Sequence, residues 1–273
     1  RGYEEGKTVS YVVQPVGKDI PTTKKIIIDN LIPQNFDALY VMGVFAGKAA
    51  KEATAEAKPF LPVVFGVISD PVGGKLVQSL QSSGNNLTGI TPNNEVIVSK
   101  RLKIFLEMVP SIKRVIFVWS DPKTSGIENL RKTVETLKIE LVEKQVKDTS
   151  EFKTFFDSYT FKPGDGILRA SDSASATFLK DMIAISLAKK IPYSGTNVND
   201  VNLGGLMSYG ADYAKIGDQA ARLMDAVLKG TKPSELPIEL PETVEFGINA
   251  KTAEAFGLTI SNDVLLQANH VIK

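Results

Sequence analysis

The chain has 273 residues, of which 43% are hydrophobic and 23% charged, the balance of a folded protein long enough for two domains. Its 32 Lys and Arg residues are matched by 31 Asp and Glu residues, so it lacks the basic excess with which nucleic-acid-binding proteins neutralise phosphates, and we expect no nucleic acid as a partner. Cysteine is absent and the only histidine is His270, which excludes thiol nucleophiles, disulfides and cysteine-based zinc sites.

The first part of the chain alternates short apolar runs with stretches of helical spacing. Residues 38–42 form an apolar run that ends at Gly43 and precedes alanines at helical spacing. Residues 63–68 form a second run, which ends at Ser69-Asp70-Pro71 and precedes apolar residues at helical spacing between 76 and 80. Continuous apolar runs are typical of strands that helices cover on both faces. We therefore predict two strand–helix units here.

The middle of the chain repeats this pattern. Residues 98–109 place apolar side chains on one helical face, and Pro110 ends that helix. The apolar run 115–119 ends at Ser120-Asp121-Pro122 and precedes a helical stretch, as does the run 167–168. Strands that alternate with helices indicate right-handed βαβ units, so the predicted fold class is α/β with doubly wound parallel sheets.

The last part of the chain adds a helix and two strands. Residues 212–229 make one apolar helical face, and Gly230 ends the helix. The run 203–210 has glycines at both ends and suits a segment that passes between two lobes, because its backbone torsions can adjust. Residues 243–249 alternate apolar and polar side chains, which predicts a strand exposed on one side.

The usual signatures of nucleotide binding and serine hydrolysis are absent. No G-x-G-x-x-G follows a strand, and neither a P-loop nor a G-x-S-x-G motif occurs. Gly73-Gly74-Lys75 suits either an anion site at a helix start or an ordinary turn. Since oxygen is the only plentiful ligand atom and no EF-hand spacing occurs, we expect no metal and no cofactor. Carboxylate-only catalysis stays open, because pairs of acidic residues cannot be recognised without a structure.

Polar residues follow three predicted strands at their carboxyl ends, which is the edge where open α/β sheets bind ligands. They are Ser69, Asp70, Ser120, Asp121, Ser171 and Asp172. Aromatic residues at or beside the same ends would supply apolar walls, and they are Phe45, Trp119, Tyr193 and Tyr209.

Two of these residues have competing interpretations. Trp119 ends a buried run, so core packing and a pocket wall explain it equally well. Asp172 either caps the helix that follows it or pairs with the ammonium group of a ligand. We hypothesise the ammonium role for Asp172, with Ser69 or backbone N–H groups holding the carboxylate of the same ligand.

Taken together, these segments resemble the ABC-transporter substrate-binding proteins that are typified by bacterial tryptophan- and tyrosine-binding receptors. The similarity extends in order over nearly the whole chain. It rests on residues 62–73 with Ser69-Asp70-Pro71-Val72-Gly73, on Asn86-Leu87-Thr88-Gly89, and on residues 100–102, 109–110, 113–115, 171–172, 190–192, 204–213, 217, 228–230, 249 and 255–258.

The resemblance implies a type I periplasmic-binding fold, in which two lobes joined by three crossings close on a small ligand. We expect residues 1–93 and 210–245 to form the first lobe, and residues 94–205 and 250–273 to form the second. The crossings should lie near 90–95, 205–210 and 243–250. The helix 212–229 should pack on the first lobe.

The resemblance also implies a function. The chain would be the extracytoplasmic solute-binding receptor of an ABC importer, a monomer and not an enzyme, whose partners are a small-molecule ligand and a membrane permease. Ligands of the family include aromatic amino acids. The candidate ligand-binding residues are Gly43, Val44, Phe45, Ala46, Ser69, Asp70, Trp119, Ser120, Asp121, Ser171, Asp172, Asn197 and Tyr209. The bulky Phe45 departs from the small-residue loop that is usual in the family, so the shape of the pocket should differ.

The family location is either the periplasm or a lipid anchor on the outer face of the cytoplasmic membrane, with the export signal absent from this sequence. No apolar run reaches the roughly 18 residues that span a bilayer. Two other functional classes stay open. A small-molecule sensor domain that signals to a partner would share the fold, since fold alone does not determine function. An α/β enzyme is disfavoured by the missing phosphate loops and the single histidine.

The start of the chain departs from the family pattern, because residues 2–7 correspond to a region beyond the first strand, and the N-terminal strand of the first lobe is missing. In a doubly wound lobe that strand would lie between the segments 8–13 and 38–42. A gap there would leave buried backbone groups unpaired, at a cost of about 1–3 kcal/mol each. We therefore predict that Thr8–Val13 pairs directly and in parallel with Ala38–Met42, with a helix near Thr22–Leu31 as the crossover.

Overall fold

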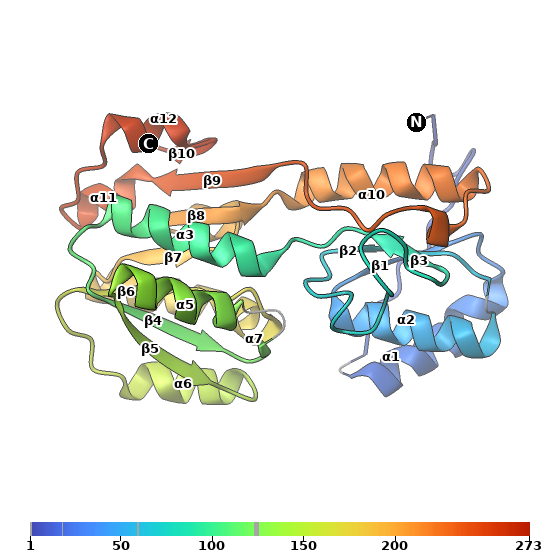
Figure 1. The fold of residues 1–273 in the computed structure, drawn as a ribbon, viewed down its shortest axis with the longest axis horizontal. Helices are drawn as coiled ribbons and strands as arrows, with labels where there is room; N and C mark the ends of the chain where they lie inside the picture. Colours follow the sequence, from blue (N-terminus) through green and yellow to red (C-terminus); the bar gives the residue numbers. More distant parts are fainter. Residues whose placement is uncertain (1, 18, 59, 123–125) are drawn as a thin grey trace. The chain divides into compact units, whose positions relative to one another are not determined.

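The computed structural model describes residues 2–17, 19–58, 60–122 and 126–273 (Figure 1). The chain divides into two compact units, which are described one at a time. Unit 1 comprises the chain up to Pro92 together with Tyr213–Pro241, and unit 2 comprises Asn93–Asp212 together with Glu242–Lys273. Both units combine helices with largely parallel sheets, so the α/β class predicted from the sequence is confirmed.

Unit 1 is built on a three-stranded parallel sheet with the order β1-β2-β3. Its strands are β1 (Leu39–Met42), β2 (Val63–Gly66) and β3 (Leu87–Gly89). Its helices are α1 (Ile20–Ile26), continued by η1 (Ile27–Leu31) and η2 (Ile32–Gln34), then α2 (Val44–Ala57), α10 (Tyr213–Leu228) and η3 (Pro233–Glu235). Helix α10 contacts β2 and β3, so this helix packs on the strands of unit 1, as the sequence predicted for the first lobe.

Small residues let α2 lie close to the core of unit 1. Ala49 and Ala53 are fully buried, in one apolar cluster with Phe65 of β2. A Cβ atom on Gly47 would lie 2.4 Å from Cδ1 of Ile68, so this position admits no side chain unless the neighbour shifts. The alanine spacing in the sequence therefore marks the packed face of the helix.

The predicted pairing of Thr8–Val13 with Ala38–Met42 is wrong. Among the described residues, strand β1 pairs with β2 alone, and residues 10–17 have no regular secondary structure. The chain just before them forms a local turn, in which the Gly6 N–H donates to the Val9 carbonyl at 2.8 Å. The N–H groups of Thr8 and Val9 are bound within this turn and are therefore not available to a sheet. Val13 is 90% exposed.

The helix expected after Pro71 does not form. The Gly74 N–H donates to the Asp70 carbonyl and the Leu76 N–H to the Pro71 carbonyl, both at 2.9 Å, which makes a single turn. Lys75 has a φ of 58°, a left-handed conformation that ends this turn. Two adjacent glycines also lower the helix propensity of the segment. Leu76 is nevertheless fully buried, so its apolar character reflects core packing without a helix.

Unit 2 is built on a seven-stranded sheet with the order β10-β9-β8-β7-β6-β4-β5. Its strands are β4 (Arg114–Trp119), β5 (Glu140–Gln145), β6 (Asp165–Leu168), β7 (Tyr193–Gly195), β8 (Met207–Ala211), β9 (Val244–Asn249) and β10 (His270–Ile272). Neighbouring strands run parallel except β8 and β9, which are antiparallel.

The predicted strand 243–249 is present as β9, but its expected exposure on one side is wrong. Phe246 and Ile248 enter the apolar cluster on one face of the sheet. On the other face α9 (Val198–Asn202) contacts β9, and a Cβ atom on Gly247 would meet its Val201 at 3.1 Å. Both faces are covered, so residues 246–249 are buried.

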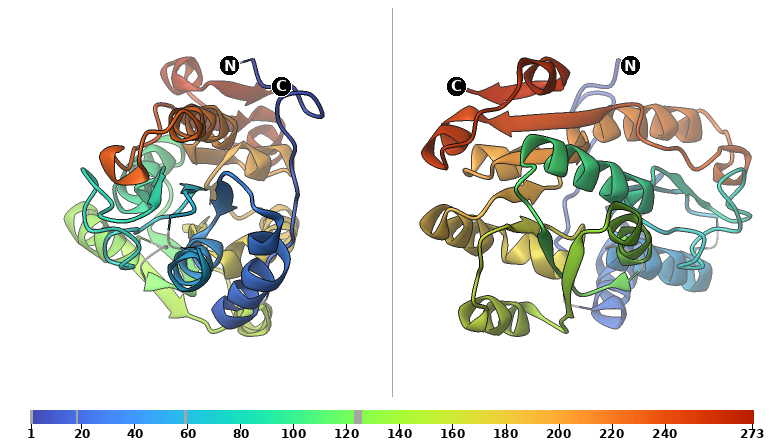
Figure 2. Two further views of the ribbon diagram at one scale, coloured as in Figure 1. Left: turned by 90° about the vertical axis from the view of Figure 1, so that its right-hand side faces the viewer. Right: turned by 60° about the vertical axis from the view of Figure 1, so that its left-hand side comes forward.

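Helices cover both faces of the sheet of unit 2. Besides α9 they are α3 (Asn94–Met108), α5 (Ile127–Leu137), α6 (Thr149–Ser158), α7 (Ser173–Thr177), α8 (Leu179–Lys189), α11 (Ala250–Ala255) and α12 (Asn262–Gln267). Helices α3 and α5 contact one another (Figure 2) and share an apolar cluster with the sheet, while α6, α7 and α8 contribute to a second cluster. None of the described helices is long and apolar enough to cross a membrane.

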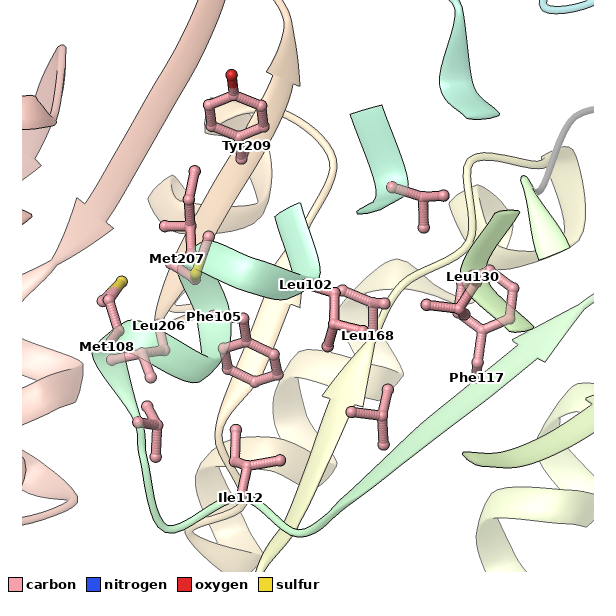
Figure 3. Packing of buried hydrophobic residues seen from close by; sticks show 14 of the residues in the cluster. Leu102, Phe105, Met108, Ile112, Phe117, Leu130, Leu168, Leu206, Met207 and Tyr209 are labelled. Atoms are coloured by element: carbon pink, nitrogen blue, oxygen red, sulfur yellow. The ribbon is translucent and has the colours of Figure 1, made fainter. Parts of the chain in front are cut away.

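The packing of α3 brings the centre of the sheet close to the helix. Figure 3 shows Leu102 and Phe105 of α3 beside Leu168 of β6 and Met207 of β8. A Cβ atom on Gly166 would lie 3.0 Å from the Phe105 ring, so glycine is needed for this approach. The helix and the strands are thereby held in a close-packed layer whose carboxyl edge carries the polar residues described next.

Candidate ligand-binding site

The parallel strands β4, β6, β7 and β8 end at one edge of the sheet of unit 2. Six predicted site residues of this unit lie at or just beyond the ends of β4, β6 and β7, and a seventh lies within β8. They are Trp119, Ser120, Asp121, Ser171, Asp172, Asn197 and Tyr209. Ser120, Asp121, Ser171 and Asn197 are partly exposed, whereas Trp119, Asp172 and Tyr209 are buried.

Asp172 links the end of one strand to the start of a helix. Its Oδ1 accepts the N–H of Ser175 at 2.9 Å, which makes Asp172 the N-cap of α7. Its Oδ2 accepts the N–H of Ser120 at 2.7 Å, at the end of β4. The helix-capping interpretation is therefore correct. Each carboxylate oxygen has further lone pairs, so the cap does not exhaust what this side chain can accept. The role of Asp172 toward a ligand stays a prediction.

Trp119 and Tyr209 belong to the same apolar cluster. The Tyr209 ring packs edge-on against Phe246 with the centroids 6.2 Å apart, and Lys100 Nζ lies 5.1 Å from the Tyr209 centroid, a cation–π distance. Trp119 is 6% exposed, and its Nε1 is buried without a hydrogen-bond partner in the part of the chain that the structure describes. Core packing thus accounts for the burial of the apolar part of the indole but not for the burial of its polar Nε1 atom.

A buried ion pair links Arg169, just after β6, to Asp200 of α9, and neither residue was predicted from the sequence. Arg169 Nε donates to Asp200 Oδ1 at 2.7 Å and Nη2 donates to Oδ2 at 3.0 Å, with side chains that are 4% and 0% exposed. The Tyr193 hydroxyl donates to the same Oδ1 at 2.6 Å, and Arg169 also donates to Thr196 Oγ1. Arg101 of α3 donates to the Arg169 carbonyl at 2.8 Å.

This network holds the start of α9 in place. Asn197 and Asp200 form a capping box, in which Asp200 Oδ2 accepts the Asn197 N–H at 3.3 Å. Burial, with the negative charge of Asp200 second, raises the pKa of Tyr193 well above its usual value, so the phenol stays protonated as a donor. The N-x-x-D spacing of residues 197–200 was the one local signal of this arrangement, because capping boxes recur at that spacing.

The remaining predicted residues belong to unit 1. Gly43 has a φ of 82° and precedes α2, its N–H donating to the Gly66 carbonyl at 3.2 Å. Phe45 is 51% exposed, whereas Ala46 is buried in the packed face of α2. These residues and Val44 follow the carboxyl end of β1.

Ser69 and Asp70 follow the neighbouring strand β2. The Thr91 hydroxyl donates to the Ser69 carbonyl at 3.1 Å, and Asp70 Oδ1 accepts the Gly73 N–H at 2.8 Å. The segment Gly73-Gly74-Lys75 is therefore a turn capped by Asp70, and the Gly73 amide is engaged within it.

The described residues include no group of three or more His, Asp or Glu side chains placed to hold a metal ion. This edge of unit 2 offers a buried carboxylate, an indole N–H, and aromatic surface beside an ammonium group, all of which can contact a ligand.

One family model matches nearly the whole chain. A model of the family described as ABC transporter substrate binding protein matches residues 1–272. The chain is 24% identical over 261 residues to the Tyrosine-binding protein of Clostridioides difficile, covering 94% of this chain and 73% of that protein.

Two solved structures are similar as well. A conserved domain protein from Vibrio cholerae has a TM-score of 0.88 and 27% identity, over 99% of this chain and 90% of that chain. An ABC domain from Streptococcus pneumonia in complex with L-Trp has a TM-score of 0.76 and 26% identity, over 93% of this chain and 85% of that chain.

Proposed function

The chain belongs to the family of ABC transporter substrate-binding proteins, and we propose that the ligand it binds is an aromatic amino acid. The proposal is supported by the L-Trp bound to the similar domain from Streptococcus pneumonia and by the name of the tyrosine-binding relative. The structural observation that carries it is the carboxyl edge of unit 2, where the buried carboxylate of Asp172 and the buried ring of Trp119 lie, together with the buried ring of Tyr209 within β8.

These groups match the parts of an aromatic amino acid. The Asp172 carboxylate pairs with the ligand's ammonium group, a charge-assisted interaction of roughly 1.5–3 kcal/mol. Trp119 and Tyr209 supply aromatic surface for the side chain, and aromatic pairs contribute about 0.5–1.5 kcal/mol beyond the burial of their area. The candidate residues of unit 1 are Gly43–Ala46 and Ser69–Asp70, and their role in ligand binding stays a prediction. Calorimetric titration of variants at these positions can test it.

The protein acts by binding and release, without chemical conversion of its ligand. Outside the cytoplasm, free in the periplasm or lipid-anchored on the outer face of the membrane, it delivers the ligand as a monomer to a membrane permease. Ser120, Asp121, Ser171, Asn197 and Asp172 then serve recognition and not acid–base catalysis.

Isothermal titration calorimetry with L-tyrosine, L-tryptophan and L-phenylalanine tests the proposal, with L-leucine and L-glutamate as controls. At least one aromatic amino acid should bind more tightly than both controls, and native mass spectrometry of protein purified without denaturation should reveal a retained ligand of matching mass. Equal or absent binding of all five amino acids would overturn the ligand class. Mass spectrometry of the amino acid after incubation should show it unchanged.

A further inference from the structure

The indole N–H of Trp119 is a buried polar group that has no acceptor among the residues the structure describes. The side chain is 6% exposed and Nε1 has no hydrogen-bond partner among the described residues. A buried donor without an acceptor costs about 1–3 kcal/mol, and buried indoles usually find one. Such a group calls for an explanation, because a phenylalanine would supply apolar surface here without that cost.

The position of Trp119 distinguishes it from the other buried groups of this kind. The hydroxyls of Ser194 and Ser208 also lack partners in the described ranges, but these residues lie within β7 and β8 and not at the last residue of either strand. Trp119 is instead the last residue of β4, at the edge where open α/β sheets bind their ligands.

Trp119 also directly precedes the residue that binds the carboxylate that we propose as the ammonium partner. The next residue, Ser120, donates its N–H to Asp172 Oδ2 at 2.7 Å. The residue with the unpartnered indole N–H therefore directly precedes the residue whose backbone N–H the buried Asp172 carboxylate binds. A zwitterionic amino acid carries the complementary pair, an ammonium donor and a carboxylate acceptor, on a single carbon atom.

We propose that the Trp119 indole N–H donates a hydrogen bond to the carboxylate of the bound amino acid, while Asp172 pairs with its ammonium group. This inference rests on the proposed function and narrows its ligand class. The site binds compounds that carry both a free carboxylate and a free ammonium group more tightly than amines that lack the carboxylate.

The sequence makes this donor directly observable, because Trp119 is the only tryptophan of the chain. Uniform ¹⁵N labelling therefore gives one indole N–H resonance, and an unlabelled ligand adds none. Saturation with L-tyrosine should move the indole proton downfield, as expected when a charged acceptor occupies the site. Tyramine, which has the same ring and ammonium group but no carboxylate, should leave the indole proton near its ligand-free position.

An isosteric replacement tests the same bond energetically. Supplying a tryptophan auxotroph with β-(benzo[b]thiophen-3-yl)alanine replaces the N–H by sulfur at this single position. The Kd for L-tyrosine should rise roughly tenfold or more, and the Kd for tyramine should not change. Ser194→Ala is the matched control, because it removes another buried polar group without a partner and should leave both Kd values unchanged. If the analogue protein does not fold, Trp119→Phe with the same pair of ligands replaces it.

The possible results separate the two proposals. Binding of L-tyrosine with an unmoved indole resonance, or an equal loss for L-tyrosine and tyramine, would overturn the role of Trp119 and leave the proposed function standing. No binding of any aromatic amino acid would overturn both proposals.

Discussion

Arg169 and Asp200 form a two-pronged ion pair in the interior of unit 2, with N–O distances of 2.7 and 3.0 Å. Arg169 follows β6 and Asp200 lies in α9, so the pair ties the loop after one strand to the helix that follows the next. The Tyr193 hydroxyl and the Asn197 N–H complete the coordination of the carboxylate. The segment that carries Thr196 and Asn197 at the edge of the sheet is thereby fixed.

Removing one partner of this pair should be strongly destabilising. Asp200→Ala leaves the guanidinium of Arg169 buried without its carboxylate, and the free energy of unfolding measured in urea should fall by about 3–5 kcal/mol. The double variant Arg169→Met with Asp200→Leu should lose less than Asp200→Ala alone, since no buried charge is left unpaired. Lys153→Ala, in the exposed pair with Asp157, is the control and should cause no measurable change. Equal effects in the interior and at the surface would contradict this account.

Tyr193 should not ionise while the protein is folded. Its pKa is raised well above the usual value, by burial first and by the charge of Asp200 second. Spectrophotometric titration of the folded wild type and of Tyr193→Phe should therefore give the same number of ionising tyrosines at alkaline pH. After unfolding in guanidinium chloride, the wild type should titrate one tyrosine more, seven against six. A difference between the folded proteins would show that the phenol is accessible.

Asp172→Asn should weaken binding of the amino acid. Loss of the negative charge removes the partner of the ligand ammonium group, and Kd should rise roughly tenfold to hundredfold by calorimetry. Asn is itself a good N-cap, so α7 should persist. Asp148→Asn is the matched control, because Asp148 caps α6 through two backbone N–H groups and is not a candidate site residue. A similar change of Kd in both variants would assign the effect to net charge or helix capping.

Glu245 should make the stability depend on pH. Burial, and then the charge of Asp212, raises the pKa of this carboxyl in β9, while His270 opposes the shift. A carboxyl whose pKa rises on folding stabilises the protein below its unfolded pKa of about 4.3, and this contribution is lost as the pH rises through the folded pKa.

Glu245→Gln should therefore raise the Tm at pH 7 and leave it nearly unchanged below about pH 4, where both side chains are neutral. Differential scanning fluorimetry at both pH values measures this, and Glu254→Gln on the exposed side of α11 is the control. A Tm that is lower at pH 7 in Glu245→Gln would show that the ionised carboxylate has a stabilising partner.

Local pattern was enough to predict the class of the fold. Continuous apolar runs gave the positions of β1, β2, β4 and β6, because a strand covered on both faces must be apolar at successive residues. Helical spacing located α3 and α10 with ends close to those observed, because one face of each helix packs on its sheet. The ordered similarity over nearly the whole chain then indicated the family, which the match to residues 1–272 confirms.

Only the tertiary structure shows which polar groups have hydrogen-bond partners and which do not. Leu76 follows a helical spacing but is buried in a turn, and the Val9 carbonyl accepts the N–H of Gly6 in a local turn and not in a strand. Arg169 and Asp200 are 31 residues apart, so no window of sequence contains the pair. Whether a buried polar atom has a hydrogen-bond partner depends on all of its neighbours in space. The sequence could therefore place Trp119 at the end of a strand. It could not show that the indole N–H lacks an acceptor among the described residues.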